Sequence, residues 1–311
     1  MASPDTYQAG LERLLRRHEL PPTYLDAIEQ IHRPLATFLA SRHRQSKSAH
    51  IWGVCGSQGS GKSTLVQFLA HELHSRFGLN TLCLSLDDFY LGRNERQRLS
   101  RQLHPLFATR GVPGTHDVNL GMTTLSHLIR RAPHGRIPIP RFDKSRDDPV
   151  PRHTWETVKA QFDIILFEGW CVGTRPQPEA DLSRPLNELE RTEDPLGIWR
   201  KTVNHHLQTH YAAWWELMEG LIFLRVPGFE QVQTWRELQE EKLRRHFLRR
   251  GEAIPPQVMS PDQIKRFIQH YERLTRWNLD VLPACSDVVL DLQEDHQFCG
   301  LHMIDSQSAH R

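Results

Sequence analysis

Residues 56–63 have the sequence Gly56-Ser57-Gln58-Gly59-Ser60-Gly61-Lys62-Ser63, which matches the phosphate-loop pattern G-x-x-x-x-G-K-S. An apolar run, 51–55, precedes this loop, and a helix-compatible segment, 64–70, follows it. The three glycines let the backbone turn tightly and direct successive N–H groups toward one point, where the start of the helix adds positive charge. This strand–loop–helix arrangement predicts a site for a polyphosphate.

The end of the loop predicts what kind of polyphosphate binds there. The ammonium of Lys62 would reach the terminal phosphates of a nucleoside triphosphate, and the hydroxyl of Ser63 would bind Mg²⁺. We therefore predict ATP and Mg²⁺ as cofactors, held by residues 56–63 and by Thr64 in the first turn of the helix. The alternative is a glycine-rich turn that binds nothing, and the full match with a strand before and a helix after argues against it.

Length and composition describe an ordinary globular chain. The 311 residues are 38% hydrophobic and 24% charged, with a formal net charge of +2. This balance suggests neither nucleic acid nor a membrane as a partner, and no apolar run approaches the ~20 residues of a membrane span. The N-terminus does not resemble a signal peptide, so we expect a cytoplasmic protein.

The five cysteines have no C-x-x-C spacing, which favours buried reduced thiols. The oligomeric state is left open.

Short apolar runs alternate with helical segments along most of the chain. We expect strands near residues 50–55, 80–86, 163–168, 220–226 and 286–291, the last of these being the final strand. Right-handed β-α-β crossovers would make them one parallel sheet with the phosphate-loop strand at its centre. The predicted fold class is therefore α/β, a five-stranded parallel sheet flanked by helices. We divide the chain into an N-terminal helical extension, 1–48, a main domain, 49–295, and a tail, 296–311.

Acidic residues follow the second predicted strand. Asp87 and Asp88 come directly after the run 81–86, and the carboxyl ends of parallel strands line the ligand crevice of an open sheet. Asp87 is in the right place to take a proton from a hydroxyl group of an acceptor. Asp88 is expected to point to the opposite side if strand geometry persists through it. The alternative is that both residues simply end the strand.

The stretch 93–118 has many charges and few apolar residues. This composition predicts a structured loop. His116 and Asp117 lie at its end, just before an expected helix, and in the alternative interpretation Asp117 is only the N-cap of that helix. The proline-rich run 137–140 is rigid and brings Arg141 and Lys144 to one place. These cations suit a substrate that carries a carboxylate. A solvated charge cluster is the competing interpretation.

Several motifs together carry a resemblance to a known family. Residues 85–90 resemble the S-x-D-x-F-Y element of the uridine kinase, pantothenate kinase and phosphoribulokinase superfamily. The other motifs are R-G-V-P-G-T-H-D at 110–117, I-P-R-F-D-K-S at 139–145, F-E-G-W at 167–170, P-L-N-E-L-E at 185–190 and Trp235-Arg236. Together they resemble the plant-type D-glycerate 3-kinase family and its bacterial and fungal relatives. The similarity covers roughly residues 49–295 and implies the phosphate-loop nucleoside triphosphate hydrolase fold.

The resemblance implies roles for individual residues. Lys62, Asp87 and Glu168 would be catalytic, with Asp87 as the base and with Glu168 organising Mg²⁺ together with Ser63. An ion pair of Glu168 with Lys62 or an arginine is the structural alternative. The substrate-binding residues would be Asp88, Tyr90, His116, Asp117, Arg141 and Lys144. The basic helix expected at 232–250 would be a lid that supplies Arg236, Arg244 and Arg245 to the phosphates, unless it is only a solvated face.

The resulting hypothesis is an ATP-dependent kinase for a small molecule that bears a carboxylate and a hydroxyl, D-glycerate in the first instance. A kinase for pantothenate, uridine or another hydroxylated metabolite is the first alternative. A nucleotide-hydrolysing switch is the second, and the absence of an N-K-x-D guanine element and of an L-S-G-G-Q signature speaks against it.

Overall fold

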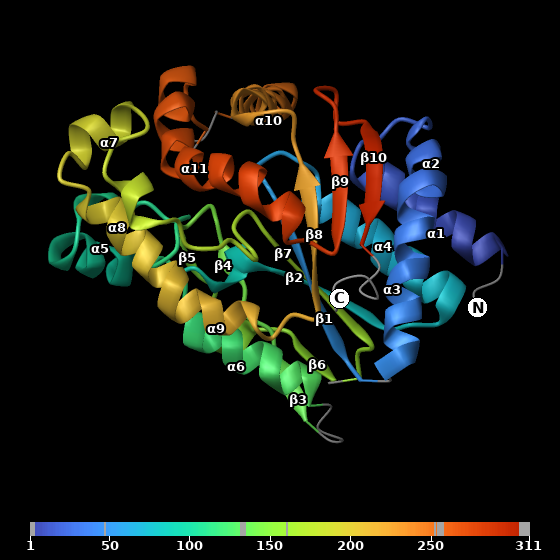
Figure 1. Ribbon diagram of the computed structural model, residues 1–311. Helices are drawn as coiled ribbons and strands as arrows, with labels where there is room; N and C mark the ends of the chain where they lie inside the picture. The colour runs from blue at the N-terminus through green and yellow to red at the C-terminus, as the bar shows by residue number, and fades with distance from the viewer. Residues whose placement is uncertain are drawn as a thin grey trace.

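The computed structural model describes residues 4–46, 48–130, 135–159, 161–251, 253 and 258–304. Its centre is a six-stranded sheet with the order β10-β9-β8-β1-β7-β2 (Figure 1). The strands are β1 (His50–Gly56), β2 (Thr81–Ser85), β7 (Ile164–Gly169), β8 (Gly220–Arg225), β9 (Val288–Leu292) and β10 (Phe298–Met303). The strands β1, β2, β7, β8 and β9 are parallel to one another, and β1 lies between β7 and β8. The predicted fold class and the interior place of the phosphate-loop strand are therefore confirmed.

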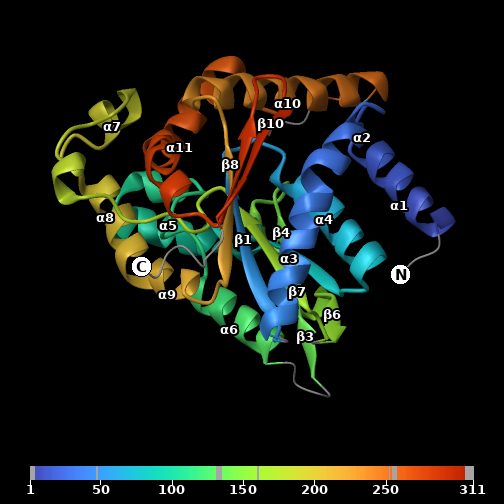
Figure 2. The same ribbon diagram turned by 45° about the vertical axis from the view of Figure 1, so that its right-hand side comes forward.

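Helices cover both faces of this sheet, as Figure 2 shows. They are α1 (Pro4–Arg17), α2 (Tyr24–Ala27), α3 (Arg33–Ser46), α4 (Lys62–Phe77), α5 (Arg93–Gln102), α6 (Val118–Ile129), α7 (Glu188–Glu193), α8 (Ile198–His206), α9 (Ala212–Trp215), α10 (Phe229–Arg249) and α11 (Pro261–Val281). Two small two-stranded antiparallel sheets, β3 (Arg136–Pro138) with β6 (Thr157–Lys159) and β4 (Phe142–Asp143) with β5 (Asp148–Pro149), lie outside the main sheet.

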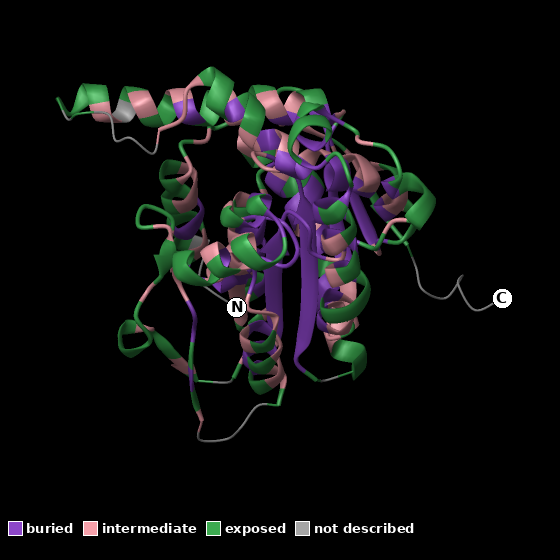
Figure 3. Ribbon diagram, turned by 90° about the vertical axis from the view of Figure 1, so that its left-hand side faces the viewer, coloured by how far each residue is buried: buried purple, intermediate pink, exposed green. Residues whose placement is uncertain are grey.

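Alternation along the buried strands divides the core into two layers. In β1, Ile51 and Cys55 pack toward α6, α8 and α9, whereas Trp52 and Val54 pack toward α3 and α4. Successive side chains of a strand point to opposite faces, so an unbroken apolar strand needs cover on both sides. Figure 3 shows these strands as a continuous buried slab. The loops at the ends of the strands are thus held by a rigid support.

Two sequence expectations about elements are wrong. The strand near residue 290 is not the last one, because β10 follows it and pairs antiparallel with β9. A register shift between Phe298 and Gly300 breaks the alternation that would have revealed β10. Residues 93–118 are not only loop, since they include α5, whose start is closed by a hydrogen bond from Gly92 N to Glu95 Oε2 of 3.0 Å. The side chain that α5 buries is Arg96, so no apolar stripe marks the helix.

The motif at 185–190 joins the segment before α8 to α11. The Asn187 amide nitrogen donates to Gln269 O at 2.9 Å, and Glu190 forms a buried ion pair with Arg273 at 2.6 Å. The motif therefore fixes α11 against the rest of the molecule.

All five cysteines are free, and Cys285 and Cys299 are exposed, against the expectation that the thiols are buried. Among the described helices, none is long and apolar enough to cross a membrane.

Candidate active site

The phosphate loop links β1 to α4 and has the backbone that its glycines require. Gly59 and Gly61 have φ angles of +79° and +87°, in the left-handed region that residues with a Cβ rarely adopt. A Cβ on Gly59 would also lie 2.9 Å from Cβ of Trp235. The side-chain oxygens of Ser57, Gln58 and Ser60 are buried and have no hydrogen-bond partner within the described part of the chain. The loop thus presents unsatisfied polar atoms at the start of a helix.

Ser63 and Glu168 bring two oxygen ligands together beside this loop. Ser63 Oγ, in the first turn of α4, donates to Glu168 Oε1, at the end of β7, with a separation of 2.9 Å. Burial raises the pKa of Glu168, while the charge of Lys62 opposes that rise. The ammonium of Lys62 itself donates to Ser57 O at 2.9 Å. A cation and a hydroxyl–carboxylate pair therefore stand at the carboxyl ends of neighbouring strands.

Asp87 faces the same cavity from the next strand. It lies in a single 3₁₀ turn, Leu86–Phe89, directly after β2, and it accepts hydrogen bonds from Lys144 Nζ at 2.6 Å and Tyr90 Oη at 2.9 Å. Burial by itself raises the pKa of Asp87. Lys144, Tyr90 and the charge of Lys62 together stabilise the carboxylate more, so its pKa lies below the ordinary value. This environment favours the ionised carboxylate of Asp87, the form that can accept a proton.

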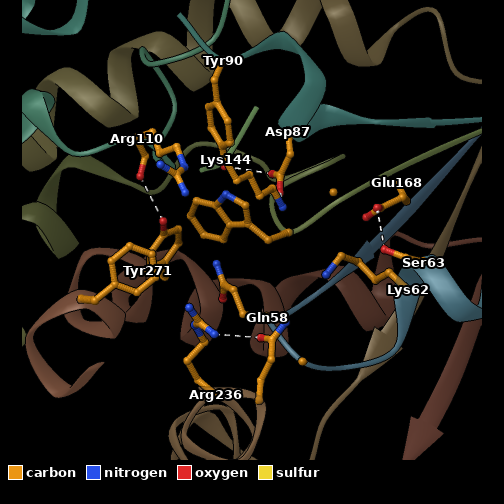
Figure 4. Close-up of a pocket in the computed structure, with 15 residues that line it drawn as sticks. Gln58, Lys62, Ser63, Asp87, Tyr90, Arg110, Lys144, Glu168, Arg236 and Tyr271 are labelled. Atoms are coloured by element: carbon orange, nitrogen blue, oxygen red, sulfur yellow. Dashed lines mark hydrogen bonds and ion pairs between the residues drawn. The ribbon is translucent and has the colours of Figure 1, made fainter. Parts of the chain in front are cut away.

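Together these residues line a cavity of about 280 Å³. Figure 4 shows Lys62, Ser63 and Glu168 at one end of it and Tyr90, Arg110 and Tyr271 at the other, with the Asp87–Lys144 pair between. The structure thus brings together the loop, Asp87, Tyr90, Lys144, Glu168 and Arg236 from the predicted set.

Asp88 has different partners from Asp87. Its carboxylate accepts from Arg141 Nη1 at 2.8 Å and from Phe142 N at 3.2 Å. Burial raises the pKa of Asp88, and Arg141 opposes this rise. Neither Asp88 nor Arg141 lines the cavity. The pair attaches the 141–143 segment to the 3₁₀ turn that carries Asp87.

His116 and Asp117 lie behind Tyr90. The His116 ring stacks on the Tyr90 ring with centroids 4.5 Å apart, its Nδ1 lies 2.6 Å from Tyr211 Oη, and burial lowers its pKa to about 3. Asp117 Oδ1 accepts from Leu120 N at 2.9 Å and so caps α6, as the alternative interpretation expected. Neither side chain lines the cavity. The His116 ring supports Tyr90 from behind, and the backbone N–H of Asp117 donates to Phe89 O at 2.8 Å.

The basic helix α10 lies across the end of the sheet at which β8 ends (Figures 1 and 2). Arg236 lines the cavity, pairs with Glu240 and lies over the Phe267 ring with 5.9 Å between Cζ and the centroid. Arg245 is exposed and pairs with Glu241 on its own helix, and Arg244 Nη2 donates to Met259 O at 3.3 Å. Of the three predicted lid arginines, Arg236 alone is found among the cavity residues of the described chain.

Sequence reasoning missed part of the cavity wall. Arg110, Trp170, Gln239, Phe267 and Tyr271 also line it. Trp170 Nε1 donates to Gly111 O at 2.9 Å, and Tyr271 Oη donates to Arg110 O at 3.0 Å, so both side chains hold the 110–111 backbone. Arg110 and Trp170 belong to motifs noted above, and this membership could have identified them as site residues. Tyr271 occupies an ordinary position of an amphipathic helix, so the sequence pattern did not indicate its place in the cavity.

A second cavity, of about 360 Å³, adjoins the other side of the loop. It shares Gly59, Lys62 and Ser63 with the first and adds Thr64 and residues of α10. The His296 ring stacks on Trp235 with centroids 4.1 Å apart, and its Nε2 lies 2.9 Å from Gly59 O. The phosphate loop therefore has room for a ligand on both sides of Lys62.

A phosphate loop on an interior strand of a mostly parallel sheet, with a carboxylate facing it from the neighbouring strand end, defines the class of P-loop nucleoside triphosphate-binding proteins. Comparisons with known proteins narrow this class. The chain is 34% identical over 231 residues to the probable ATP-dependent kinase TDA10 of Saccharomyces cerevisiae, covering 70% of this chain and 73% of that protein. The chain belongs to this family of ATP-dependent P-loop kinases.

Other relatives agree with this assignment. The chain is 31% identical over 228 residues to the chloroplastic D-glycerate 3-kinase of Arabidopsis thaliana, covering 70% of this chain but 45% of that enzyme, so it spans about half of the plant protein's length. It is 28% identical to the uncharacterized kinase mug58 of Schizosaccharomyces pombe, covering 86% of this chain and 97% of that protein. No family model matches the chain.

Solved structures share the fold. The D-glycerate 3-kinase of Cryptococcus neoformans superposes with a TM-score of 0.70 at 22% identity, covering 89% of this chain and 99% of that one. The YGR205w protein superposes with a TM-score of 0.67, also at 22% identity, covering 90% of this chain and 98% of that one. At this level of identity the likeness concerns the fold alone.

Proposed function

We propose that this kinase transfers the γ-phosphoryl group of ATP to the primary hydroxyl of D-glycerate, giving 3-phosphoglycerate and ADP. The observation that carries the proposal is the position of the Asp87 carboxyl group, which lines one cavity with Lys62 and Ser63 and accepts a hydrogen bond from Lys144. A hydrolytic switch has no need of a carboxylate for an acceptor hydroxyl. The Arabidopsis thaliana relative named D-glycerate 3-kinase supports the choice of acceptor.

Asp87 is proposed as the general base. A primary hydroxyl is a poor nucleophile, and its proton must leave as the bond to phosphorus forms, so a carboxylate within hydrogen-bond reach is the expected device. Its pKa, held below the ordinary value by Lys144 and Tyr90 against the effect of burial, keeps it ionised at neutral pH. Lys144 is proposed to contact the carboxylate of the acceptor. A direct role of Asp88, His116, Asp117 or Arg141 in acceptor binding stays a prediction.

The residues at the other end of the cavity fit ATP and Mg²⁺. Ser63 and Glu168 offer two hard oxygen ligands, and Mg²⁺ is usually held by one or two protein oxygens together with substrate phosphates. Mg²⁺ would neutralise charge on the phosphates. The hydroxyls of Ser57 and Ser60 and the ammonium of Lys62 would donate to the phosphate oxygens, and Arg236 would approach from α10. The adjoining cavity, which includes Thr64, leaves room for the nucleoside.

An acceptor screen tests the proposal. ADP formation is measured with D-glycerate, L-glycerate, pantothenate, uridine and no acceptor, each with and without Mg²⁺. We expect strong stimulation by D-glycerate and dependence on Mg²⁺. Equal ADP formation without any acceptor would favour a hydrolytic switch, and stimulation by uridine or pantothenate alone would change the acceptor.

A cytoplasmic location also stays a prediction, and one relative is chloroplastic.

A further inference from the structure

The end of the cavity that Tyr90 and Tyr271 line, here called the acceptor end, holds the cation of Arg110 as well as that of the predicted Lys144. Arg141 is paired with Asp88, away from the cavity, and Lys144 is paired with Asp87. Each of these two cations therefore has a carboxylate of its own. Arg110 points into the cavity beside Tyr90 (Figure 4), and its Cζ lies 5.6 Å from the centroid of the Phe142 ring.

The partner of Arg110 is a carboxylate that two arginines share. One oxygen of Asp147 accepts from Arg110 Nη1, and the other lies 2.7 Å from Nη2 of Arg96. Two guanidinium groups and one carboxylate leave an excess of one positive charge. Nε and Nη2 of Arg110 have no hydrogen-bond partner among the residues that the structure describes. The excess charge and these spare donors are together at the cavity wall, as a carboxylate ligand requires.

Arg96 fixes this arrangement to the backbone. It is 1% exposed, and it donates to Leu91 O at 3.1 Å, Ala108 O at 2.8 Å and Asp147 O at 3.0 Å. Asp147 has a φ of +58°, a left-handed conformation that aspartate and asparagine adopt more readily than most residues. Three chain segments thus meet at one buried guanidinium, which holds the Asp147 carboxylate against Arg110.

We propose that Arg110 binds the carboxylate of the acceptor and that Asp147, anchored by Arg96, positions the Arg110 guanidinium for this contact. The proposal rests on the proposed function in one respect, that the acceptor is a carboxylate. It assigns the discrimination between carboxylate and neutral acceptors to Arg110. Lys144 then stabilises the carboxylate of Asp87 and is a second cation of the acceptor site.

Steady-state kinetics of Arg110→Ala test the assignment. Loss of a hydrogen-bonded ionic contact should raise KM for D-glycerate roughly tenfold to a hundredfold, with KM for ATP nearly unchanged. The preference for D-glycerate over glycerol, which has the hydroxyls but no carboxylate, should fall by a similar factor. Arg146→Ala is the matched control, because Arg146 is 80% exposed and pairs with Asp143 outside the cavity. An unchanged KM for D-glycerate in Arg110→Ala, or an equal rise for ATP, overturns the proposal.

Asp147→Asn tests the positioning role, because asparagine tolerates the left-handed backbone and keeps the shape of the side chain. We expect KM for D-glycerate to rise several-fold with KM for ATP unchanged. An equal change in both KM values would show that Asp147 has only a structural role and would overturn that part of the proposal. Thermal midpoints of all variants identify any that fail to fold, and Arg110→Lys then replaces Arg110→Ala.

The wild-type enzyme separates this inference from the proposed function. Turnover with D-glycerate tests the function alone. If another carboxylate, L-glycerate or pantothenate, is the acceptor used, the function fails and the Arg110 variants are assayed with that acceptor. A wild type that uses uridine alone, or none of these acceptors, overturns the inference as well.

Discussion

The two ends of the cavity are built in different ways. At the nucleotide end, one continuous segment, residues 56–64, supplies the loop, Lys62 and Ser63, and the strand end at Glu168 completes it. At the acceptor end, side chains from distant segments meet through ion pairs, such as Asp87 with Lys144 and Arg110 with Asp147. The first end depends on backbone geometry and the second on side-chain pairing. Substitutions should therefore act differently on ATP and on the acceptor.

The largest effect is expected at the nucleotide end. Lys62→Ala should lower kcat by roughly 10³ or more, because the lost cation contacts charge that grows in the transition state. The protein should stay folded, since the hydrogen bond that the Lys62 ammonium makes among the described residues is the one to Ser57 O. The measurement is turnover together with the thermal midpoint. Near-normal turnover in this variant would contradict the kinase mechanism.

The next effect separates the two neighbouring aspartates. Asp87→Asn should lower kcat by about 10² to 10⁴, the usual contribution of general base catalysis, with ATP affinity nearly intact. Asp88→Asn should lose less, because its carboxylate pairs with Arg141 outside the cavity. Steady-state kinetics and ATP titration check both variants. A larger loss in Asp88→Asn, or a loss of ATP binding in Asp87→Asn, would mean that the base is assigned wrongly.

A smaller effect is expected on the pH profile. The base must be ionised, so kcat/KM for the acceptor falls as the pH drops through the pKa of Asp87, which Lys144 and Tyr90 hold below its ordinary value. Lys144→Met removes the largest stabilising charge and leaves the burial that raises this pKa. The acid limb of kcat/KM should therefore move to higher pH, with a raised KM for the acceptor. An unmoved acid limb would show that another group titrates there.

The smallest effect concerns α10. Arg236→Ala should lower kcat roughly tenfold, because Arg236 is the predicted lid arginine that lines the cavity. Arg245→Ala should lower kcat less, because Arg245 is exposed, pairs with Glu241 on its own helix and is not among the described residues that line the cavity. Parallel kinetics of the two variants rank them. An equal or larger loss in Arg245→Ala would require a closed state in which α10 turns a different face to the phosphates.

The nucleotide end and the five parallel strands were predictable from sequence because each depends on local order. A phosphate loop must have glycine where φ is positive, and a strand buried on both faces must be apolar throughout. The strand β10 and the helix α5 were missed because one contains a register shift and the other buries an arginine. Both departures remove the periodic signal on which such predictions depend.

The acceptor end was less predictable because ion pairing decides which charges face the cavity. The motif at 139–145 supplies both Arg141 and Lys144, but Asp88 takes the first and Asp87 the second. Arg110 is equally visible in its motif, and only the meeting of Arg96 and Asp147 shows that it has spare donors toward the cavity. No pattern of spacing contains that information.

The most direct test of phosphoryl transfer to an acceptor hydroxyl is identification of the product. The wild-type enzyme is incubated with ATP, Mg²⁺ and D-glycerate, and phosphorus NMR follows ATP, ADP, inorganic phosphate and phosphorylated glycerate. We predict one 3-phosphoglycerate for each ADP, with no matching rise in inorganic phosphate, and loss of this product in Asp87→Asn. Release of inorganic phosphate in equal amount to ADP, with or without D-glycerate, would contradict the account.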